Sequence, residues 1–276
     1  MRRLLLCCLA VAAAALAQSP QNIVVTSASS FQVGIPARGS IGAIFCTGVI
    51  VSGTVQAAGA PLPWSLAGVS VTVGGANAPL FSVSALNGYQ QINFQVPQEA
   101  VFAFDGSATI TVTQNGNTGI VTAQYLYASP GDFFMLPNSP YGPFQHTDFS
   151  LVTGANPAKA GETIIGYLTG LPGTVPVVPT GQASPYSPLA VVPQPRVGSG
   201  ERFISEYSVV TSAGPASISF LGLAPGLVGV YQMNFDLPFQ TPPGDLSIRL
   251  DLRKCLDTCL FTGTSFDSKS VVLPVR

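Results

Sequence analysis

The side chains that could perform catalysis are few and scattered along the chain. His146 is the single histidine, so any Ser/His/Asp triad would have to use it, and it stands in a proline-rich segment. No Gly-x-Ser-x-Gly, His-Glu-x-x-His or phosphate-cradling glycine motif occurs. A carboxylate pair for glycoside cleavage could come from any two of Asp105, Asp132, Asp236, Asp245 and Asp251. These aspartates stand mostly near predicted turns and strand ends, where Asp caps local backbone groups. We therefore predict that the chain is not an enzyme and uses no cofactor.

Three cysteines follow the N-terminal segment. Cys255 and Cys259 bracket a loop length suited to a β-hairpin, and in an oxidising compartment this spacing predicts a disulfide between them. A metal site would need two further ligands, and the single histidine, His146, is far away in sequence, so no metal is predicted. Cys46 lies in an apolar stretch without a basic neighbour to activate it, which predicts a buried, inert thiol.

Two polar or aromatic features could contact a ligand. Asn93 and Asn234 occupy equivalent places in two similar segments, and they could either contact a ligand or satisfy backbone groups where a strand bends; we favour the structural role, because a shared fold needs the same local solution twice. Trp64, the only tryptophan, lies in a loop-like Pro-Leu-Pro-Trp-Ser context. It could stack on a sugar ring, although anchoring of its own loop is the favoured interpretation.

Residues 1–17 have the pattern of a secretory signal peptide. Arg2 and Arg3 precede a short apolar run, and Ala15-Leu16-Ala17 supplies a small-x-small cleavage pattern before Gln18. The run is too short to span a bilayer as a helix, and no later segment is long and apolar enough to do so. The sequence thus predicts a secreted or extracytoplasmic protein, located in a periplasm or at a cell surface, without a membrane span.

Charge is scarce throughout the chain. Asp, Glu, Lys and Arg together make up 8% of the residues, and the formal net charge is −1. Because binding to nucleic acid depends on clustered basic side chains, and no such cluster is visible, a nucleic-acid partner is excluded. The abundance of Thr, Val, Gly and Pro instead favours strands joined by tight turns.

An internal repeat divides the chain into two copies. Residues 39–49 (GSIGAIFCTGV) match residues 161–171 (GETIIGYLTGL), and residues 91–97 (QINFQVP) match residues 232–238 (QMNFDLP). The order is the same in both halves, and the interval between the two segments is longer in the second. A duplicated domain with an insertion in its second copy accounts for this pattern.

Alternation of apolar and polar residues predicts short antiparallel strands in both copies, for example at residues 69–73 and 246–250. We predict an all-β chain of two tandem immunoglobulin-like β-sandwiches. Domain 1 is placed at residues 18–128 and domain 2 at residues 158–276, with a proline-rich insertion at 172–202. Residues 129–157 are predicted to be a proline- and aromatic-rich connector that packs against the sandwiches, or that offers a binding surface.

The same segments resemble a known family. The chain is similar to the uncharacterised C-terminal domain described from Solibacter-type proteins, which occurs on secreted and surface proteins of bacteria. The similar stretches are residues 61–63 (PLP), 66–75 (LAGVSVTVGG), 78–81 (APLF), 91–97, 158–171 and 222–234 (GLAPGLVGVYQMN). The resemblance covers most of residues 36–250 as two divergent copies. It implies an exported bacterial protein with Ig-like (IPT/TIG-like) domains, and it implies no activity.

The function predicted from these observations is that of a non-enzymatic exported structural or interaction protein, adhesion-like, with an unknown protein or glycan at the cell exterior as its partner. The alternative is an extracellular carbohydrate-binding protein. Exposed aromatic side chains near Trp64 or in the connector would favour the alternative, and burial of all of them would favour a scaffold.

Overall fold

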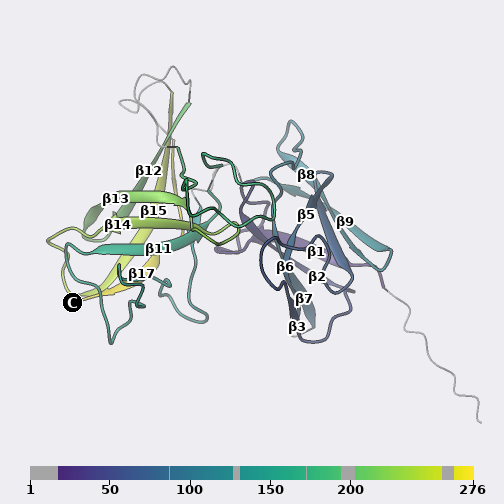
Figure 1. The fold of residues 1–276 in the computed structure, drawn as a ribbon, viewed down its shortest axis with the longest axis horizontal. Coiled ribbons are helices and arrows are strands. Elements are labelled where there is room, and N and C mark those ends of the chain that lie inside the picture. Colours follow the sequence, from purple (N-terminus) through teal and green to yellow (C-terminus); the bar gives the residue numbers. More distant parts are fainter. Residues whose placement is uncertain (1–17, 87, 127–130, 172, 194–202, 257–263) are drawn as a thin grey trace, which may run out of the picture.

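The computed structural model describes residues 18–86, 88–126, 131–171, 173–193, 203–256 and 264–276. Every regular element in these ranges is a β-strand, and no helix there could cross a membrane. The strands form two β-sandwiches arranged one after the other along the long axis of the molecule (Figure 1). The predicted signal peptide, residues 1–17, lies outside the described residues.

The first sandwich has the strand order of an immunoglobulin domain. One sheet runs β1-β2-β7-β6-β3 and the other β5-β4-β8-β9. Apart from the short β3 at the edge, these correspond to the A-B-E-D and C′-C-F-G sheets of that fold. The strands are β1 (Gln21–Ser27), β2 (Ile41–Thr47), β3 (Thr54–Gln56), β4 (Val69–Val73), β5 (Ala76–Ala78), β6 (Leu80–Leu86), β7 (Tyr89–Gln95), β8 (Ser107–Gln114) and β9 (Asn117–Gln124).

The second sandwich repeats this order, and its C, D and F strands are longer than those of the first. Its A-B-E-D sheet is β10-β11-β14-β13, and β12, β15 and β17 take the C, F and G places, while β16 pairs with the far half of β15. Pairing of β12 with β13 joins the two sheets at one edge. The strands are β10 (Asp132–Phe133), β11 (Thr163–Thr169), β12 (Phe203–Thr211), β13 (Gly214–Leu223), β14 (Tyr231–Asp236), β15 (Gly244–Leu256), β16 (Thr264–Asp267) and β17 (Val271–Val275).

The segments that match in sequence are the B and E strands of the two copies, and they pair in the same register. Ala43 lies opposite Asn93 in the first sandwich, and Ile165 lies opposite Asn234 in the second. The repeat therefore corresponds to one structural unit, the central strand pair of each A-B-E-D sheet. The prediction of two tandem Ig-like sandwiches is confirmed at the level of strand order.

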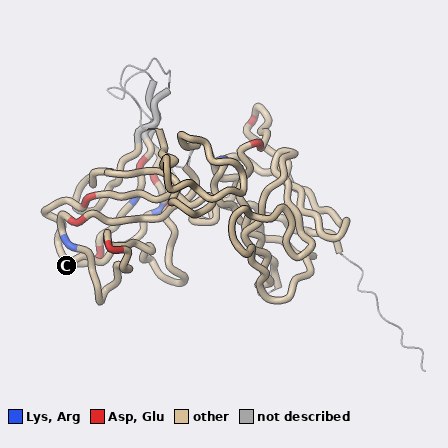
Figure 2. Tube along the Cα trace, in the orientation of Figure 1, with Lys and Arg blue, Asp and Glu red and all other residues tan. Residues whose placement is uncertain are grey.

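Each sandwich encloses its own hydrophobic core, because alternate side chains of the strands point inward. In β4 the valines at both ends and in the middle are buried and the residues between them are half-buried. Charged side chains are few along both sandwiches (Figure 2).

The predicted connector belongs largely to the second sandwich. Phe133 and Phe144 are each 1% exposed, and their rings lie 5.4 Å apart, centroid to centroid, and pack against Phe235 of β14. Residues 131–157 therefore contribute β10 and core side chains instead of forming a separate linker. The reason is their aromatic content, which makes burial in the core favourable.

Buried polar contacts join the two sandwiches. The hydroxyl of Thr169, at the end of β11, accepts a hydrogen bond from the backbone N–H of Ile41 in β2 at 2.9 Å and donates to the carbonyl of Gly229 at 2.9 Å. Beside it, Ser40 Oγ accepts from the N–H of Gly170 at 3.0 Å. Thr169 and Ser40 are both 0% exposed, so these bonds lie away from solvent.

The proline-rich insertion makes the second set of contacts. Its described part runs from residue 173 to 193, and the N–H of Gly181 donates to Gln95 Oε1 of the first sandwich at 2.6 Å. The carbonyl of Gly181 accepts from the N–H of Leu62 at 2.9 Å, and Thr180 Oγ1 donates to Glu99 Oε2 at 2.7 Å. The insertion therefore spans from one sandwich to the other (Figure 1).

Candidate functional site

A groove on the outer face of the second A-B-E-D sheet gathers aromatic and amide side chains. Residues directly opposite each other in antiparallel strands share a face. Tyr167 of β11 is opposite Gln232 of β14, and Asn234 of β14 is opposite Phe220 of β13. These four side chains form the floor of a cavity of about 450 Å³.

Loops that are distant in sequence supply the walls of this groove. Phe149 comes from the segment predicted to be a connector (residues 129–157), Tyr186 and Leu189 come from the insertion, and Leu227 comes from the β13–β14 loop. Phe149 is 64% exposed and Tyr186 is 78% exposed. Large apolar surfaces left open to water at the rim of a cavity are typical of binding sites.

Phe149 is held in an unusual backbone conformation. It ends a tight turn in which its N–H bonds to the carbonyl of His146 at 2.9 Å, and its φ is +66°, in the left-handed region. A bulky side chain in this region is disfavoured by contact between its Cβ and the backbone. Asp148 closes the turn by accepting from the N–H of Ser150 at 2.9 Å.

Tyr186 is positioned by backbone pairing between the insertion and the β13–β14 loop. The N–H of Ser184 donates to the carbonyl of Leu227 at 2.9 Å, and the N–H of Gly226 donates to the carbonyl of Ser184 at 2.8 Å. A Cβ on Gly226 would lie 2.5 Å from Tyr186 Oη, so glycine is needed for the phenol to lie over this loop.

The floor amides adopt the same arrangement in both copies of the repeat. Gln232 Nε2 donates to Asn234 Oδ1 at 2.9 Å, and Gln91 Nε2 donates to Asn93 Oδ1 at 2.9 Å. The asparagines were expected to bond to backbone groups. This expectation is wrong for their Oδ1 atoms, which accept from the side-chain amide of the glutamine two residues earlier. The strand pairing opposite each asparagine is also irregular: the register of β6 against β7, and of β13 against β14, shifts at that point.

A counterpart groove of about 430 Å³ lies on the first sandwich. Its lining includes Gln56 of β3, Phe81 of β6 and Asn93 of β7, and its opposite wall is the β13–β14 loop, including Leu227. Asn93 also donates from Nδ2 to Ser82 Oγ at 3.1 Å. Leu227 thus borders both grooves and, at 46% exposed, forms the ridge between them.

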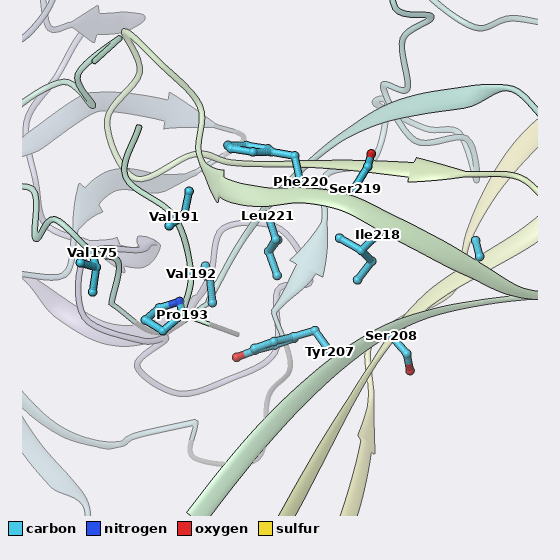
Figure 3. Close-up of a pocket in the computed structure, with 11 residues that line it drawn as sticks. Val175, Val191, Val192, Pro193, Tyr207, Ser208, Ile218, Ser219, Phe220 and Leu221 are labelled. Carbon is cyan, nitrogen blue, oxygen red and sulfur yellow. The ribbon is translucent and has the colours of Figure 1, made fainter. Parts of the chain in front are cut away.

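A larger cavity of about 770 Å³ lies between the insertion and strands β12 and β13. Its walls are mainly apolar, and Tyr207 extends across it with its hydroxyl toward Pro193 (Figure 3). Burial holds the pKa of Tyr207 well above its ordinary value, so the phenol stays protonated. Pro193 adjoins residues 194–202, which lie outside the described part of the chain, and we assign no site to this cavity.

His146 is bound by groups that give it a structural role in its turn. Its Nδ1 lies 2.5 Å from Glu162 Oε1, and its Nε2 lies 3.2 Å from the carbonyl of Asn156. Burial lowers the pKa of this imidazole, but the bonds to Glu162 and Asn156 outweigh it and the pKa is raised. Ser150 Oγ donates instead to Asp148 Oδ1 at 2.6 Å, so the serine hydroxyl is paired with the aspartate and not with the imidazole, and the three residues lack the arrangement of a triad.

The remaining predicted residues are dispersed. Trp64 is 50% exposed and does not line either groove. Cys46 is 0% exposed, which confirms a buried cysteine, and burial raises the pKa of its thiol to about 11. Cys259 and the side chain of Cys255 lie outside the described residues, so their disulfide stays a prediction. Within the described residues no cluster of three or more His, Cys, Asp or Glu side chains could hold a metal ion.

The sequence placed Phe149 in an aromatic segment predicted to pack against the sandwiches or to offer a binding surface, but it did not reveal Tyr186 and the floor residues as a group. An isolated tyrosine between two serine–proline pairs, in Ser184-Pro185-Tyr186-Ser187-Pro188, was the available clue. An aromatic residue in a segment without strand alternation has no core position to fill by pattern.

Comparisons with known proteins give no family. No protein-family model and no curated protein matches the chain. Among solved structures, the tandem Ig domains A164-A165 of titin align over 94% of this chain and 96% of theirs, at 10% identity and a TM-score of 0.21. The C-terminal domain of the AgI/II polypeptide BspA of Streptococcus agalactiae aligns over 92% and 99%, at 10% identity and a TM-score of 0.20. These TM-scores are low, so the fold assignment rests on the strand order described above.

Proposed function

We propose that the chain is a non-enzymatic, exported interaction protein in which two Ig-like sandwiches act as one rigid unit that presents a binding surface. The observation that carries this proposal is the buried hydrogen bonding between the sandwiches. Tandem domains joined only by a free linker reorient readily. Here both a backbone N–H of β2 and an amide of β7 are bonded to the second sandwich, at Thr169 and Gly181.

The fixed orientation has a functional consequence. Both amide-lined grooves border the same β13–β14 loop, so their relative position depends on the junction between the sandwiches. A hinge at the junction would separate them, whereas a rigid junction presents them together. Preorganisation of this kind reduces the entropy lost on binding a partner.

Small-angle X-ray scattering of residues 18–276 tests the rigid unit. We expect a scattering curve that a single conformation fits, and we expect Gln95→Leu to broaden the distribution of intramolecular distances, because the variant removes the bond to Gly181. Gln124→Leu, at an exposed position of β9, is the matched control and should leave the curve unchanged. A wild-type curve that requires many interdomain orientations would contradict the proposal.

Export is tested separately. When the full chain is expressed in a bacterium with an intact secretion pathway, we expect the recovered protein to begin at Gln18, after removal of residues 1–17. Intact-mass analysis of the extracytoplasmic fraction measures this. Recovery of only the uncleaved chain from the cytoplasm would contradict an exported protein.

The alternative function, extracellular carbohydrate binding, is favoured by one observation. Phe149 and Tyr186 expose most of their surface at the rim of a groove whose floor carries two amides. Exposed aromatic faces beside hydrogen-bonding side chains suit sugar rings, which have apolar C–H faces and hydroxyl edges.

A further inference from the structure

We propose that the two grooves are subsites of one continuous site for a neutral saccharide chain, which would run from Phe149 and Tyr186 across Leu227 to Phe81 and Gln56. This deepens the proposed function, because it names the ligand class and the surface of the interaction protein. Four independent features of the described residues support it: the charge of the lining, the amide side chains of both grooves, the exposed aromatic rings and the continuity of the two grooves.

The lining of both grooves is uncharged. No Asp, Glu, Lys, Arg or His lies among the described residues that border either cavity. A charged ligand would lose its hydration there without gaining an opposite charge. The ligand that fits this lining is therefore neutral but rich in hydrogen-bonding groups.

The amide pair of the second sandwich offers a matched donor and acceptor. Gln232 Nε2 donates to Asn234 Oδ1. The other polar atom of each amide, the acceptor Gln232 Oε1 and the donor Asn234 Nδ2, is left to bond elsewhere. Each hydroxyl of a sugar both donates and accepts. Two neighbouring hydroxyls on one ring can therefore bond to the oxygen of one amide and the nitrogen of the other.

The aromatic rings provide apolar contact on the opposite side of the groove. An aromatic face is electron-rich, and it attracts the slightly positive C–H groups on the face of a pyranose. Phe149 keeps its position in spite of a disfavoured backbone conformation, with φ at +66°. Strain of this kind persists where the surrounding structure imposes it and is concentrated at binding sites.

The two grooves share a wall, which favours a chain over a single sugar. Leu227 lines both, and Gly226 lines the first-sandwich groove while supporting Tyr186 of the other. Each groove also presents an asparagine of the repeated strand, Asn93 or Asn234, beside an amide of a glutamine, which is Gln56 in the first groove and Gln232 in the second. Linked sugars that occupy both subsites gain affinity, because the second contact is made within the same complex.

Isothermal titration calorimetry on residues 18–276 tests the proposal with defined probes: cellohexaose, laminarihexaose, mannohexaose, xylohexaose and β-1,4-galactohexaose, each beside its disaccharide. We expect at least one hexasaccharide to bind saturably, and its disaccharide to bind about tenfold more weakly. Absence of binding by every hexasaccharide would overturn the proposal. A proline decapeptide that binds in the groove in their place would assign it to extended peptides, and this result would also overturn it.

Variants locate the site. Tyr186→Ala combined with Phe149→Ala should weaken hexasaccharide binding by about tenfold or more, since truncation of aromatic contacts at a binding centre commonly has this effect. Asn93→Ala should weaken the hexasaccharide and leave the disaccharide unaffected if the disaccharide occupies the aromatic subsite. Phe104→Ala, at a fully exposed position of the first sandwich, is the matched control for aromatic truncation.

Circular dichroism confirms that each variant is folded before it is titrated. Binding that survives in the double variant, or that is lost equally in the Phe104 control, would place the site elsewhere and overturn the assignment. The scattering experiment on the junction is independent of any sugar. A rigid molecule that binds none of the probes would therefore refute the saccharide site and leave the rigid interaction protein in place.

Discussion

Replacement of Thr169 by valine tests the junction between the two sandwiches. Valine has nearly the shape of threonine and suits a strand equally well, so packing is preserved and only the hydroxyl is lost. The substitution removes the bond from the N–H of Ile41 and the bond to the carbonyl of Gly229, each 2.9 Å long. Both backbone groups then stay buried without this partner, because position 169 is 0% exposed.

The expected cost follows from those two groups. A buried donor or acceptor left unsatisfied costs about 1–3 kcal/mol, so the variant should lose about 2–4 kcal/mol of stability after partial relaxation. With a urea dependence of about 2 kcal/mol per molar, the midpoint should fall by roughly 1–2 M. One of the two bonds joins the sandwiches, so the variant should also unfold less cooperatively.

Equilibrium urea unfolding of residues 18–276 provides the assay. Trp64, the only tryptophan, is in the first sandwich and reports on it by fluorescence, whereas circular dichroism reports on both. The two transitions should coincide in the wild type and separate in Thr169→Val. Thr109→Val, the same change at an exposed position of β8, should alter neither. Equal midpoints for the Thr169 and Thr109 variants would refute the reasoning that the buried hydroxyl couples the sandwiches.

Three further predictions concern individual side chains. The pKa of His146 is raised in the folded protein, so its pairing with Glu162 stabilises the fold fully at pH values below the pKa of the unfolded chain. This contribution is lost as the pH rises through the pKa of the folded protein. Urea midpoints should therefore fall over that pH window in the wild type and stay level in His146→Gln. At position 149, with φ at +66°, Phe149→Gly should be about 1 kcal/mol more stable than Phe149→Ala, as measured by urea midpoints, because only glycine relieves the left-handed strain. Cys46, with its thiol pKa at about 11, should resist Ellman's reagent at pH 8 in the native protein and react after unfolding.

Each of these has a clear contrary result. A pH profile that is unchanged in His146→Gln would show that the imidazole does not titrate differently on unfolding. Equal stability of the glycine and alanine variants at position 149 would show that the turn relaxes and stores no strain. Native labelling of Cys46 at the rate of the unfolded chain would show that its strand opens readily.

Several strands of both copies could be predicted from the sequence because their pattern is local. Alternation at residues 69–73 places every second side chain in a core, whichever sandwich surrounds it. The matching segments at 39–49 and 161–171 likewise indicated a duplicated unit, and the equal pairing of Asn93 and Asn234 bears this out. Such signals depend only on neighbours along the chain.

The connector and the insertion could not be placed in this way. Phe144 and Phe149 are five residues apart in the same proline-rich stretch, yet one is 1% exposed and the other 64% exposed. Their exposures differ because Phe144 packs against Phe235 in the core, while the turn that ends at Phe149 directs the ring of Phe149 outward. No period in the sequence distinguishes the two.

By itself, the sequence determined an all-β chain of two related sandwiches with little charge, since strand alternation, turn residues and composition act locally or in bulk. Only the tertiary structure decided that Tyr186, Phe149 and Asn234 meet at one groove, and that Leu227 joins this groove to a second one. These residues come from an insertion, a turn, a strand and a loop. Their proximity depends on long-range packing and on backbone hydrogen bonds between segments, such as that from Ser184 to Leu227, and no pattern along the chain records it.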